Sequence, residues 1–240
     1  LGWVRLMGDV ATGVGSPVTF WVSKDSGSED AIAYVIQSGL GLPDEAYYRE
    51  EAHAETLSAY EKHVAEMLEF LDPARLFGLG AEVAAHRIVA LEKELAAGHW
   101  DVVSTRDAVK TYNPCEFSEL PTMTRALLSG GNLPEHRVVN MMPSYLEHFE
   151  SLFTTARMAD WQLWATWHIL RSRAAMLPEE VGAKNFEFYG TRLSGATQQR
   201  DRWKRAVGLA ESLVGEEIGQ VFVDKHFPAS SKSEMDTLLA

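Results

Sequence analysis

The first forty residues carry two short runs of β-branched and aromatic residues, separated by a polar turn. Val18–Val22 reads VTFWV and Ala31–Gln37 reads AIAYVIQ, while the intervening SKDSGSED is rich in turn-forming residues. Apolar runs on either side of such a turn are typical of paired strands. The pattern therefore predicts a small β hairpin within residues 1–40.

The spacing of apolar residues becomes helical after the glycine-rich segment SGLGLP. Pro43 and the two acidic residues after it are typical of a helix start, because proline lacks only an amide that the first turn leaves unpaired. Apolar residues then recur every three or four positions, until Asp72-Pro73 predicts the end of the helix. The recurring positions are Leu57, Tyr60, Val64, Met67, Leu68 and Leu71.

Helical periodicity continues through the remainder of the chain. A helix is predicted from Ala81 to Ala97, and its core positions are Val83, Ile88, Leu91 and Leu95. Further helices are predicted at about 118–128, 143–156, 159–177 and 197–223. No internal repeat or long linker interrupts the pattern. The sequence thus predicts a mainly α protein, a multi-helix lobe with a small β hairpin near the N-terminus and a helical body over residues 44–240.

Residues 185–207, NFEFYGTRLSGATQQRDRWKRAV, mix aromatic and basic residues, as RNA-binding surfaces do. From Thr197 onward, however, the apolar residues fall on one helical stripe and the basic residues lie around its borders. This stripe comprises Trp203, Ala206, Val207, Ala210, Leu213, Val214 and Ile218. Glycines at 208, 215 and 219 weaken a helix, which indicates close packing against another element. We therefore interpret this segment as a core helix with a solvated basic edge.

The composition excludes several classes of function. A net charge of −12 opposes binding to nucleic acid or to an anionic membrane surface. The single cysteine, Cys115, excludes an internal disulfide framework. No apolar run reaches the roughly 18 residues of a membrane span, and no signal-peptide pattern is present. The chain starts without methionine and stops within an amphipathic pattern, so we expect it to be part of a longer, soluble protein.

Metal ligation is the first candidate chemistry. Glu50 and His53 form an E-x-x-H pair, a spacing that places both side chains on one helix face. His63 and Glu66 repeat the spacing in reverse order, and His86 lies on the next predicted helix. A carboxylate di-metal bundle needs two E-x-x-H pairs and two further glutamates, and only one pair has that order. We interpret these residues as structural or solvated; a self-contained metal site on Glu50, His53 and His63 is an alternative.

Cysteine and glycine motifs give weaker signals. Cys115 adjoins a proline and is far in sequence from any histidine, so nothing predicts an activated nucleophile. Gly13–Gly15 and Gly39–Gly41 match neither a dinucleotide-binding nor a phosphate-binding loop, and we interpret them as short turns. The H-E-x-x-H signature of helical zinc peptidases is absent from the chain.

Tryptophan recurs at every third position from Trp161 to Trp167. This spacing places the rings on adjoining flanks of one helix, where burial usually explains such a run. We interpret the three residues as core. A platform for a sugar or a hydrophobic ligand, or a patch covered by a partner, is the alternative.

Several segments occur in a specific order: VTFWVSKDSG leading into IQSGLGLPDEAYY, then IVALEKELA, STRDAVKTYNPCEFSEL, VVNMMPSYLEHFESLF and finally FEFYGTRLSG with RWK, continuing to GQVFVDKHFPASSK. Together they span nearly all of the chain and resemble the non-catalytic N-terminal region of the neprilysin and endothelin-converting-enzyme family of zinc metallopeptidases. The matching motif positions are Gly39, Leu40, Gly41, Leu42, Pro43, Tyr47, Tyr48, Arg106, Tyr112, Asn113, Pro143, Tyr145 and Leu146.

The resemblance implies a region without the catalytic residues. In this family, zinc is bound by the two histidines of H-E-x-x-H and a downstream glutamate, and the glutamate within the motif activates a zinc-bound water. None of these elements is present here, so no catalytic or metal-binding residue is assigned and the substrate-binding residues stay unknown. Zinc is expected in the parent enzyme and no cofactor in this region.

The resemblance also implies a role. The matched region forms a helical lobe that faces the zinc lobe across an enclosed cavity and restricts access to short peptides. We therefore expect this chain to wall and gate the cavity of a zinc-dependent metalloendopeptidase that acts as an oligopeptidase. Its expected partners are the zinc lobe and, in the parent enzyme, peptide substrates. The chain alone is expected to be inactive. The lone cysteine departs from the disulfide-rich, membrane-anchored animal members and favours a bacterial source, cytoplasmic or exported. A stand-alone α-helical binding or scaffold module without catalysis is the alternative.

Overall fold

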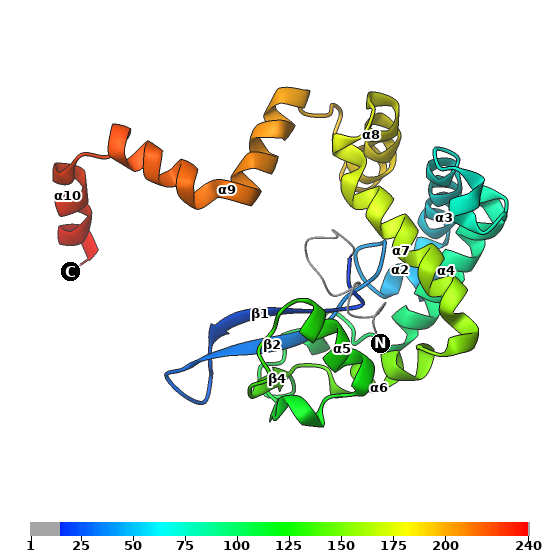
Figure 1. The fold of residues 1–240 in the computed structure, drawn as a ribbon, viewed down its shortest axis with the longest axis horizontal. Coiled ribbons are helices and arrows are strands. Elements are labelled where there is room, and N and C mark those ends of the chain that lie inside the picture. Colours follow the sequence, from blue (N-terminus) through cyan, green and yellow to red (C-terminus); the bar gives the residue numbers. More distant parts are fainter. Residues whose placement is uncertain (1–14, 240) are drawn as a thin grey trace. The chain divides into compact units, whose positions relative to one another are not determined.

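The computed structural model describes residues 15–239, which divide into two units (Figure 1). The first unit, Leu1–Phe188, contains a small sheet and most of the helices. The second unit, Tyr189–Ala240, contains α9 (Arg202–His226) and α10 (Ala229–Leu239). The predicted fold class, mainly α with a small β element near the N-terminus, is confirmed.

The predicted hairpin is present near the N-terminus. β1 (Val18–Lys24) and β2 (Ala31–Gln37) pair in antiparallel fashion, with Trp21 opposite Tyr34. The two rings stack with their centroids 5.6 Å apart. Cross-strand aromatic pairs of this kind stabilise a two-stranded ribbon, so side-chain contact adds to the backbone ladder here.

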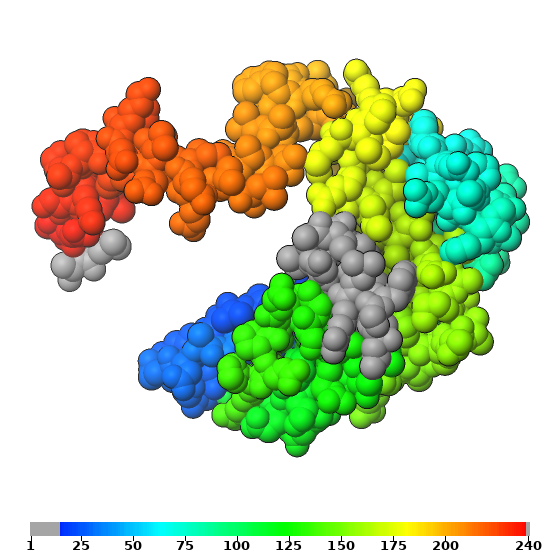
Figure 2. All heavy atoms as spheres, viewed as in Figure 1, coloured from blue at the N-terminus to red at the C-terminus, as the bar shows by residue number. Residues whose placement is uncertain are grey.

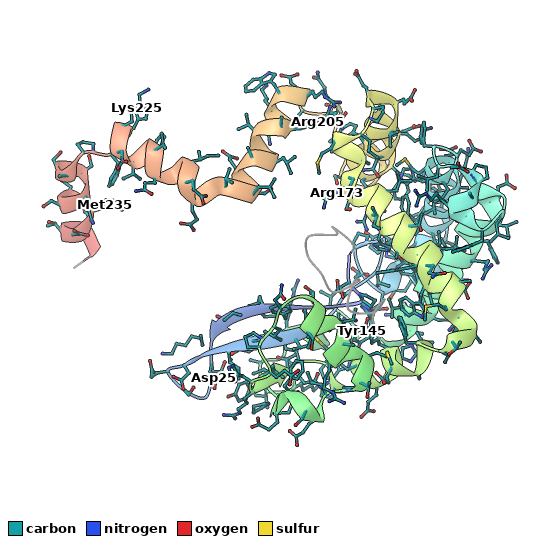
Figure 3. All side chains as sticks on the ribbon, viewed as in Figure 1. Asp25, Tyr145, Arg173, Arg205, Lys225 and Met235 are labelled. Carbon is teal, nitrogen blue, oxygen red and sulfur yellow. The ribbon has the colours of Figure 1, made fainter. Side chains whose placement is uncertain are left out.

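Asp25 organises the turn of this hairpin and lies near its tip (Figure 3). Its buried carboxylate accepts hydrogen bonds from the Tyr112 hydroxyl at 2.7 Å, the Gly27 amide at 3.0 Å and the Ser28 hydroxyl at 3.0 Å. These bonds, that of Tyr112 foremost, lower the pKa of Asp25. The turn is therefore tied both to itself and to a distant segment of the chain.

Two short strands complete the sheet. β4 (Val138–Asn140) pairs in parallel with β2, and β3 (Pro114–Cys115) pairs in antiparallel fashion with β4. The strand order is β1-β2-β4-β3. Neither short strand is predicted from the sequence, because a run of two or three residues shows no measurable alternation. β4 is stabilised by pairing with the longer strand β2, and β3 by pairing with β4.

The helices of the first unit pack around α4 (Ala81–Gly98). It contacts α3 (Ala54–Leu68), α6 (Pro143–Leu152) and α7 (Met158–Arg173). The other helices of the unit are α2 (Ala46–Arg49), α5 (Thr122–Gly130) and α8 (Glu179–Phe186), and a π-helical segment, Glu187–Leu193, follows α8. Because α4 contacts three long helices, a residue buried on α4 can bond to several elements at once.

Aromatic side chains fill much of this core. Trp161, Trp164 and Trp167 are fully buried, which confirms their interpretation as core residues. The Trp161 indole N–H donates to the Leu152 carbonyl at 3.2 Å, and those of the other two donate to groups described below. A buried indole whose N–H has a partner keeps its apolar stabilisation without leaving a polar group unsatisfied.

Two details predicted for the early helices are wrong. The helix expected from Pro43 is interrupted, because Glu50 adopts an extended backbone conformation (φ −87°, ψ 134°) and α3 begins only at Ala54. Val83, predicted as a core position of α4, is 53% exposed. The inward face of α4 instead starts at Ala84, whose small side chain is fully buried.

The later helices are displaced from their predicted boundaries by a few residues. Those expected at 118–128, 143–156 and 159–177 correspond to α5, α6 and α7. The amphipathic pattern at the end of the chain corresponds to α10. α8 has no predicted counterpart, because it is short and its apolar periodicity is too brief to separate it from the neighbouring segments.

The interpretation of residues 197–223 as a buried helix is wrong. The helix exists as α9, but none of its residues is buried, and Trp203 and Leu213 are 65% and 72% exposed. A Cβ added at any of its three glycines would meet no atom of the described residues within 4 Å. Figure 2 draws the atoms of α9 in orange. Helical periodicity correctly predicted an amphipathic helix, but within the second unit its apolar stripe is not buried.

Candidate functional site

Hydrogen bonds from distant side chains hold the glycine-rich loop that follows β2. Gly39 has φ +95°, a left-handed conformation that glycine adopts readily, and a Cβ there would lie 2.8 Å from the Pro17 Cα atom. The Trp164 indole N–H donates to the Gly39 carbonyl at 3.1 Å. The Tyr145 hydroxyl, labelled in Figure 3, lies 2.6 Å from the Pro17 carbonyl and 3.1 Å from that of Ser38. The segment forms a short turn, as predicted, and side chains from distant helices hold it in place.

Gly41 occupies the deepest position of the loop. A Cβ at this residue would overlap the Tyr60 hydroxyl and lie 3.1 Å from Glu92 Oε1. The backbone amides of Gly41 and Leu42 both donate to the Tyr48 hydroxyl at 3.0 Å. Glycine is therefore required at 41 for close approach, and at 39 for both backbone conformation and close approach.

Beneath the loop, the carboxylate of Glu92 joins four helices. Its side chain is completely buried on α4 and accepts hydrogen bonds from Tyr48 of α2 at 2.7 Å and Tyr60 of α3 at 3.1 Å. His168 Nε2 of α7 lies 2.9 Å from Glu92 Oε1. The Trp167 indole N–H donates to the Tyr60 hydroxyl at 2.8 Å. A buried carboxylate is tolerated when polar partners replace its lost water, and here three side chains do so.

The protonation state of His168 follows from this geometry. Where the Glu92 carboxylate accepts, Nε2 of the imidazole carries the proton of this hydrogen bond. Burial lowers the pKa of His168, while the Glu92 carboxylate opposes this shift. The direction that prevails favours a neutral imidazole. The Glu92–His168 contact thus acts mainly as a buried hydrogen bond that ties α4 to α7.

Two adjoining clefts open beside the loop and share Glu45, His99 and Trp100 in their linings. Their volumes are about 450 and about 300 Å³. The buried Glu45 carboxylate pairs with Arg49, with Nε 2.5 Å from Oε2 and Nη2 3.1 Å from Oε1. Asp101 also lines the larger cleft. Charged groups of both signs at these clefts can contact a polar ligand.

Reciprocal hydrogen bonds hold Trp100 at the clefts. The Gln37 side-chain amide donates to the Trp100 carbonyl and accepts from the Trp100 amide, each at 2.8 Å. The Trp100 indole N–H donates to the Ser144 hydroxyl at 2.7 Å. His99 Nε2 lies 3.2 Å from the Ser38 carbonyl, and burial lowers the pKa of His99 to about 4. Trp100, which follows α4, is therefore held in the lining of both clefts by Gln37 of β2 and Ser144 of α6.

The predicted E-x-x-H pair does not share a helix face. Glu50 is extended between α2 and the short 3₁₀ turn Glu51–His53, so the helical spacing argument fails there. Glu50 bonds Arg49 at 3.1 Å, and the His53 ring stacks on Tyr47 with centroids 4.1 Å apart. Each residue thus makes a local contact instead of converging on a common point.

The other histidines of the candidate metal group lie in separate environments. His63 is buried, with its ring stacked on Phe188 at 4.9 Å, and burial lowers its pKa to about 4. His86 is exposed and lies 2.9 Å from Glu61, while Glu66 pairs with Lys184 at 3.2 Å. Throughout residues 15–239, no group of three or more histidine, cysteine, aspartate or glutamate side chains could hold a metal ion.

Cys115 lies in β3 and is partly buried. Burial raises the pKa of its thiol, and the Glu119 carboxylate adds to this effect. A nucleophilic cysteine needs a lowered pKa, so its environment is that of an unreactive thiol. Of the two glycine turns, Gly39–Gly41 is described above and Gly13–Gly15 lies largely outside the described residues.

Sequence reasoning missed the Glu92 cluster. Its signal is visible in IVALEKELA, where Glu92 takes a position at helical spacing from the buried residues Ile88 and Leu95. A charged residue inside an apolar stripe indicates a buried polar partner. That partner could not be named from the sequence, because His168 is 76 residues away.

Comparison with known proteins places the chain in a family. The model of peptidase family M13 matches residues 2–240, so the chain belongs to that family. Neprilysin-2 of Drosophila melanogaster is 28% identical over 223 residues, which are 82% of this chain and 28% of its own length. Human endothelin-converting enzyme 1 is 27% identical over 233 residues, 89% of this chain and 29% of its own. The predicted relation to neprilysin and endothelin-converting enzyme is confirmed.

Solved structures agree with this assignment. The open state of the zinc metalloprotease Zmp1 of Mycobacterium tuberculosis matches with a TM-score of 0.86 and 40% identity, over 98% of this chain and 38% of that chain. The match is to the N-terminal region of the family, as its model indicates. The chain thus spans about a third of the length of these relatives. Among residues 15–239, every helix is too short or too polar to cross a membrane.

Proposed function

We propose that this chain is the non-catalytic helical lobe of a zinc-dependent metalloendopeptidase, and that it walls and gates the cavity in which the parent enzyme holds peptides. The observation that carries the proposal is the family match over residues 2–240, together with a similar zinc metalloprotease of which the chain covers only 38%. The chain lacks H-E-x-x-H, and within residues 15–239 the acidic and histidine side chains do not converge on a metal position. The residues present do not fit a zinc site, so zinc and its ligands belong to the remainder of the parent.

A wall must keep its shape while peptides enter and leave. The Glu92 cluster supports this role, because one buried carboxylate links α2, α3, α4 and α7 through side-chain hydrogen bonds. Buried polar networks that are fully satisfied hold the elements around them in a single arrangement. In its gating role, the lobe restricts access to the cavity. This restriction would exclude folded proteins and long chains and would favour short peptides.

The test compares this chain with the same chain continued through the length that its relatives share. The longer chain should cleave a short fluorogenic peptide, lose that activity with a zinc chelator, and spare the same sequence embedded in a folded protein. The 240-residue chain should cleave neither substrate. Cleavage by the 240-residue chain, abolished by substitutions within it, would contradict the proposal and favour a self-contained enzyme.

A further inference from the structure

The ring of His63 is buried where α3 and α7 meet the last residues of the first unit. Only 4% of His63 is exposed. Its ring stacks on that of Phe188, with centroids 4.9 Å apart and planes 10° apart. The uncharged indole of Trp167 on α7 meets it at a steep angle, with centroids 5.7 Å apart. A histidine packed between two aromatic rings has exchanged water for apolar contacts, which favours the neutral imidazole over the charged one.

The charged groups around His63 balance one another. Lys184 Nζ of α8 lies 3.2 Å from Glu66 Oε2 of α3 and 3.0 Å from Oε2 of Glu187, the residue that follows α8. Lys62 Nζ of α3 lies 3.6 Å from Glu66 Oε1. Two lysines thus face two glutamates. These four groups carry no net charge, so they leave little to balance a proton on the ring.

Burial lowers the pKa of His63 to about 4. A hydrogen bond with Asn185 and the charges of Glu66 and Glu187 oppose this shift, whereas the charge of Lys184 adds to it. An exposed histidine titrates near 6.5. A conformation that exposes the ring therefore binds the proton more tightly than the buried one does. Such a conformation gains population as the pH falls from about 6.5 to about 4.

Separation of α8 from α3 is the smallest opening that exposes His63. Phe188, which covers the ring, follows α8 by two residues. α8 packs against α3 and against the short turn Ala174–Met176 that precedes it. It buries two residues, Val181 and Gly182, whereas α3 buries five and also contacts α4. Elements with little buried surface open most readily, so α8 is the one of the two helices that should move.

We propose that His63 is a pH-sensitive switch: a proton on its buried ring releases α8 and Phe188 from α3, while the remainder of the first unit stays folded. This inference goes beyond the proposed function and does not rest on it. The released residues are the last of the first unit, since the second unit begins at Tyr189. Acidification thereby loosens the segment of the chain that leads into the second unit.

Hydrogen–deuterium exchange of the amides of residues 183–188, measured by NMR on this chain at pH 7 and pH 5, tests the switch. Protection factors correct for the intrinsic effect of pH on exchange. They should fall about twentyfold between these pH values, because the ring titrates near 6.5 when exposed and near 4 when buried. At both pH values these amides should be less protected than those of residues 88–95 in α4, which open with the whole unit. Equal protection of the two segments, or no fall at pH 5, would overturn the proposal.

A matched pair of variants assigns the effect to one side chain. His63→Phe keeps a ring against Phe188 and removes the titrating group, so protection of residues 183–188 should differ by less than about twofold between the two pH values. His86→Gln is the control, because the His86 side chain is 73% exposed and pairs with Glu61. This variant should keep the full fall. A fall that persists in His63→Phe would assign it to another titrating group and contradict the switch. If His63→Phe does not fold, the comparison of α8 with α4 in the unsubstituted chain decides the question.

Discussion

The Tyr48 hydroxyl donates a hydrogen bond to Glu92 Oε2 at 2.7 Å, between a four-residue helix and the central helix of the first unit. The same hydroxyl accepts hydrogen bonds from the backbone amides of Gly41 and Leu42. One side chain thus fixes both the glycine loop and the buried carboxylate. The tyrosine of the family-like motif GLGLPDEAYY therefore has a structural reason for its spacing from the glycines.

Replacement of Tyr48 by phenylalanine should destabilise the first unit by about 2–4 kcal/mol, because two buried amides lose their acceptor and Glu92 loses a donor. Chemical denaturation monitored by tryptophan fluorescence would measure the change. Tyr47→Phe is the matched control, since the Tyr47 ring stacks on His53 and is only partly buried. Its effect should stay within about 0.5 kcal/mol. Equal effects of the two variants would show that the buried hydroxyl contributes little.

Gly41→Ala should destabilise the protein by more than about 3 kcal/mol, because the new methyl group overlaps the Tyr60 hydroxyl and crowds Glu92. Gly80→Ala serves as the control. Gly80 precedes α4 with φ −66°, and a Cβ there meets nothing within 4 Å. Its effect should stay within about 1 kcal/mol. A thermal melt of both variants would measure the difference, and a mild effect of Gly41→Ala would mean that the loop can move away.

Stability should depend on the protonation of His63. Burial lowers its folded-state pKa to about 4, whereas an unfolded histidine titrates near 6.5. Between these values the unfolded state binds more protons, so stability falls as pH decreases from about 6.5 to about 4 and this contribution is level below that. The lost stability is on the order of 2–3 kcal/mol.

The variant His63→Phe, which keeps a ring against Phe188, should show a smaller loss of stability over the same pH range. Denaturant titrations at several pH values would measure the slope for both proteins. An NMR titration of the His63 ring would give its midpoint directly. An unchanged slope in the variant, or a midpoint near 6.5, would contradict the argument.

Much of the fold is predictable from local sequence patterns. The run VTFWV predicts β1 because β-branched and aromatic residues suit a strand in any context, and Tyr60, Val64, Met67 and Leu68 predict the buried face of α3 through their spacing. β3 and β4 are invisible in the sequence, because each is stabilised by a strand that lies far away in the chain. No sequence pattern comparable to those of β1 and α3 predicts the separation into two units.

The candidate site was less predictable than the fold. The position of Glu92 within an apolar stripe indicates burial, but its partners His168 and Tyr48 lie far away in sequence and cannot be named from it. The E-x-x-H pair at Glu50 failed for the opposite reason, since the spacing is meaningful only where the backbone is helical. For α9, periodicity identifies the apolar face and cannot say what covers it.

We propose that this chain is the lobe of a zinc peptidase that does not bind the metal. The most direct measurement is zinc content per chain, by elemental mass spectrometry after dialysis of the purified, tag-free protein. The 240-residue chain should hold far less than one zinc, and the chain continued through the length of its relatives should hold about one. About one zinc in the 240-residue chain, lost on His53→Ala, would contradict the account and assign a metal site to Glu50, His53 and His63.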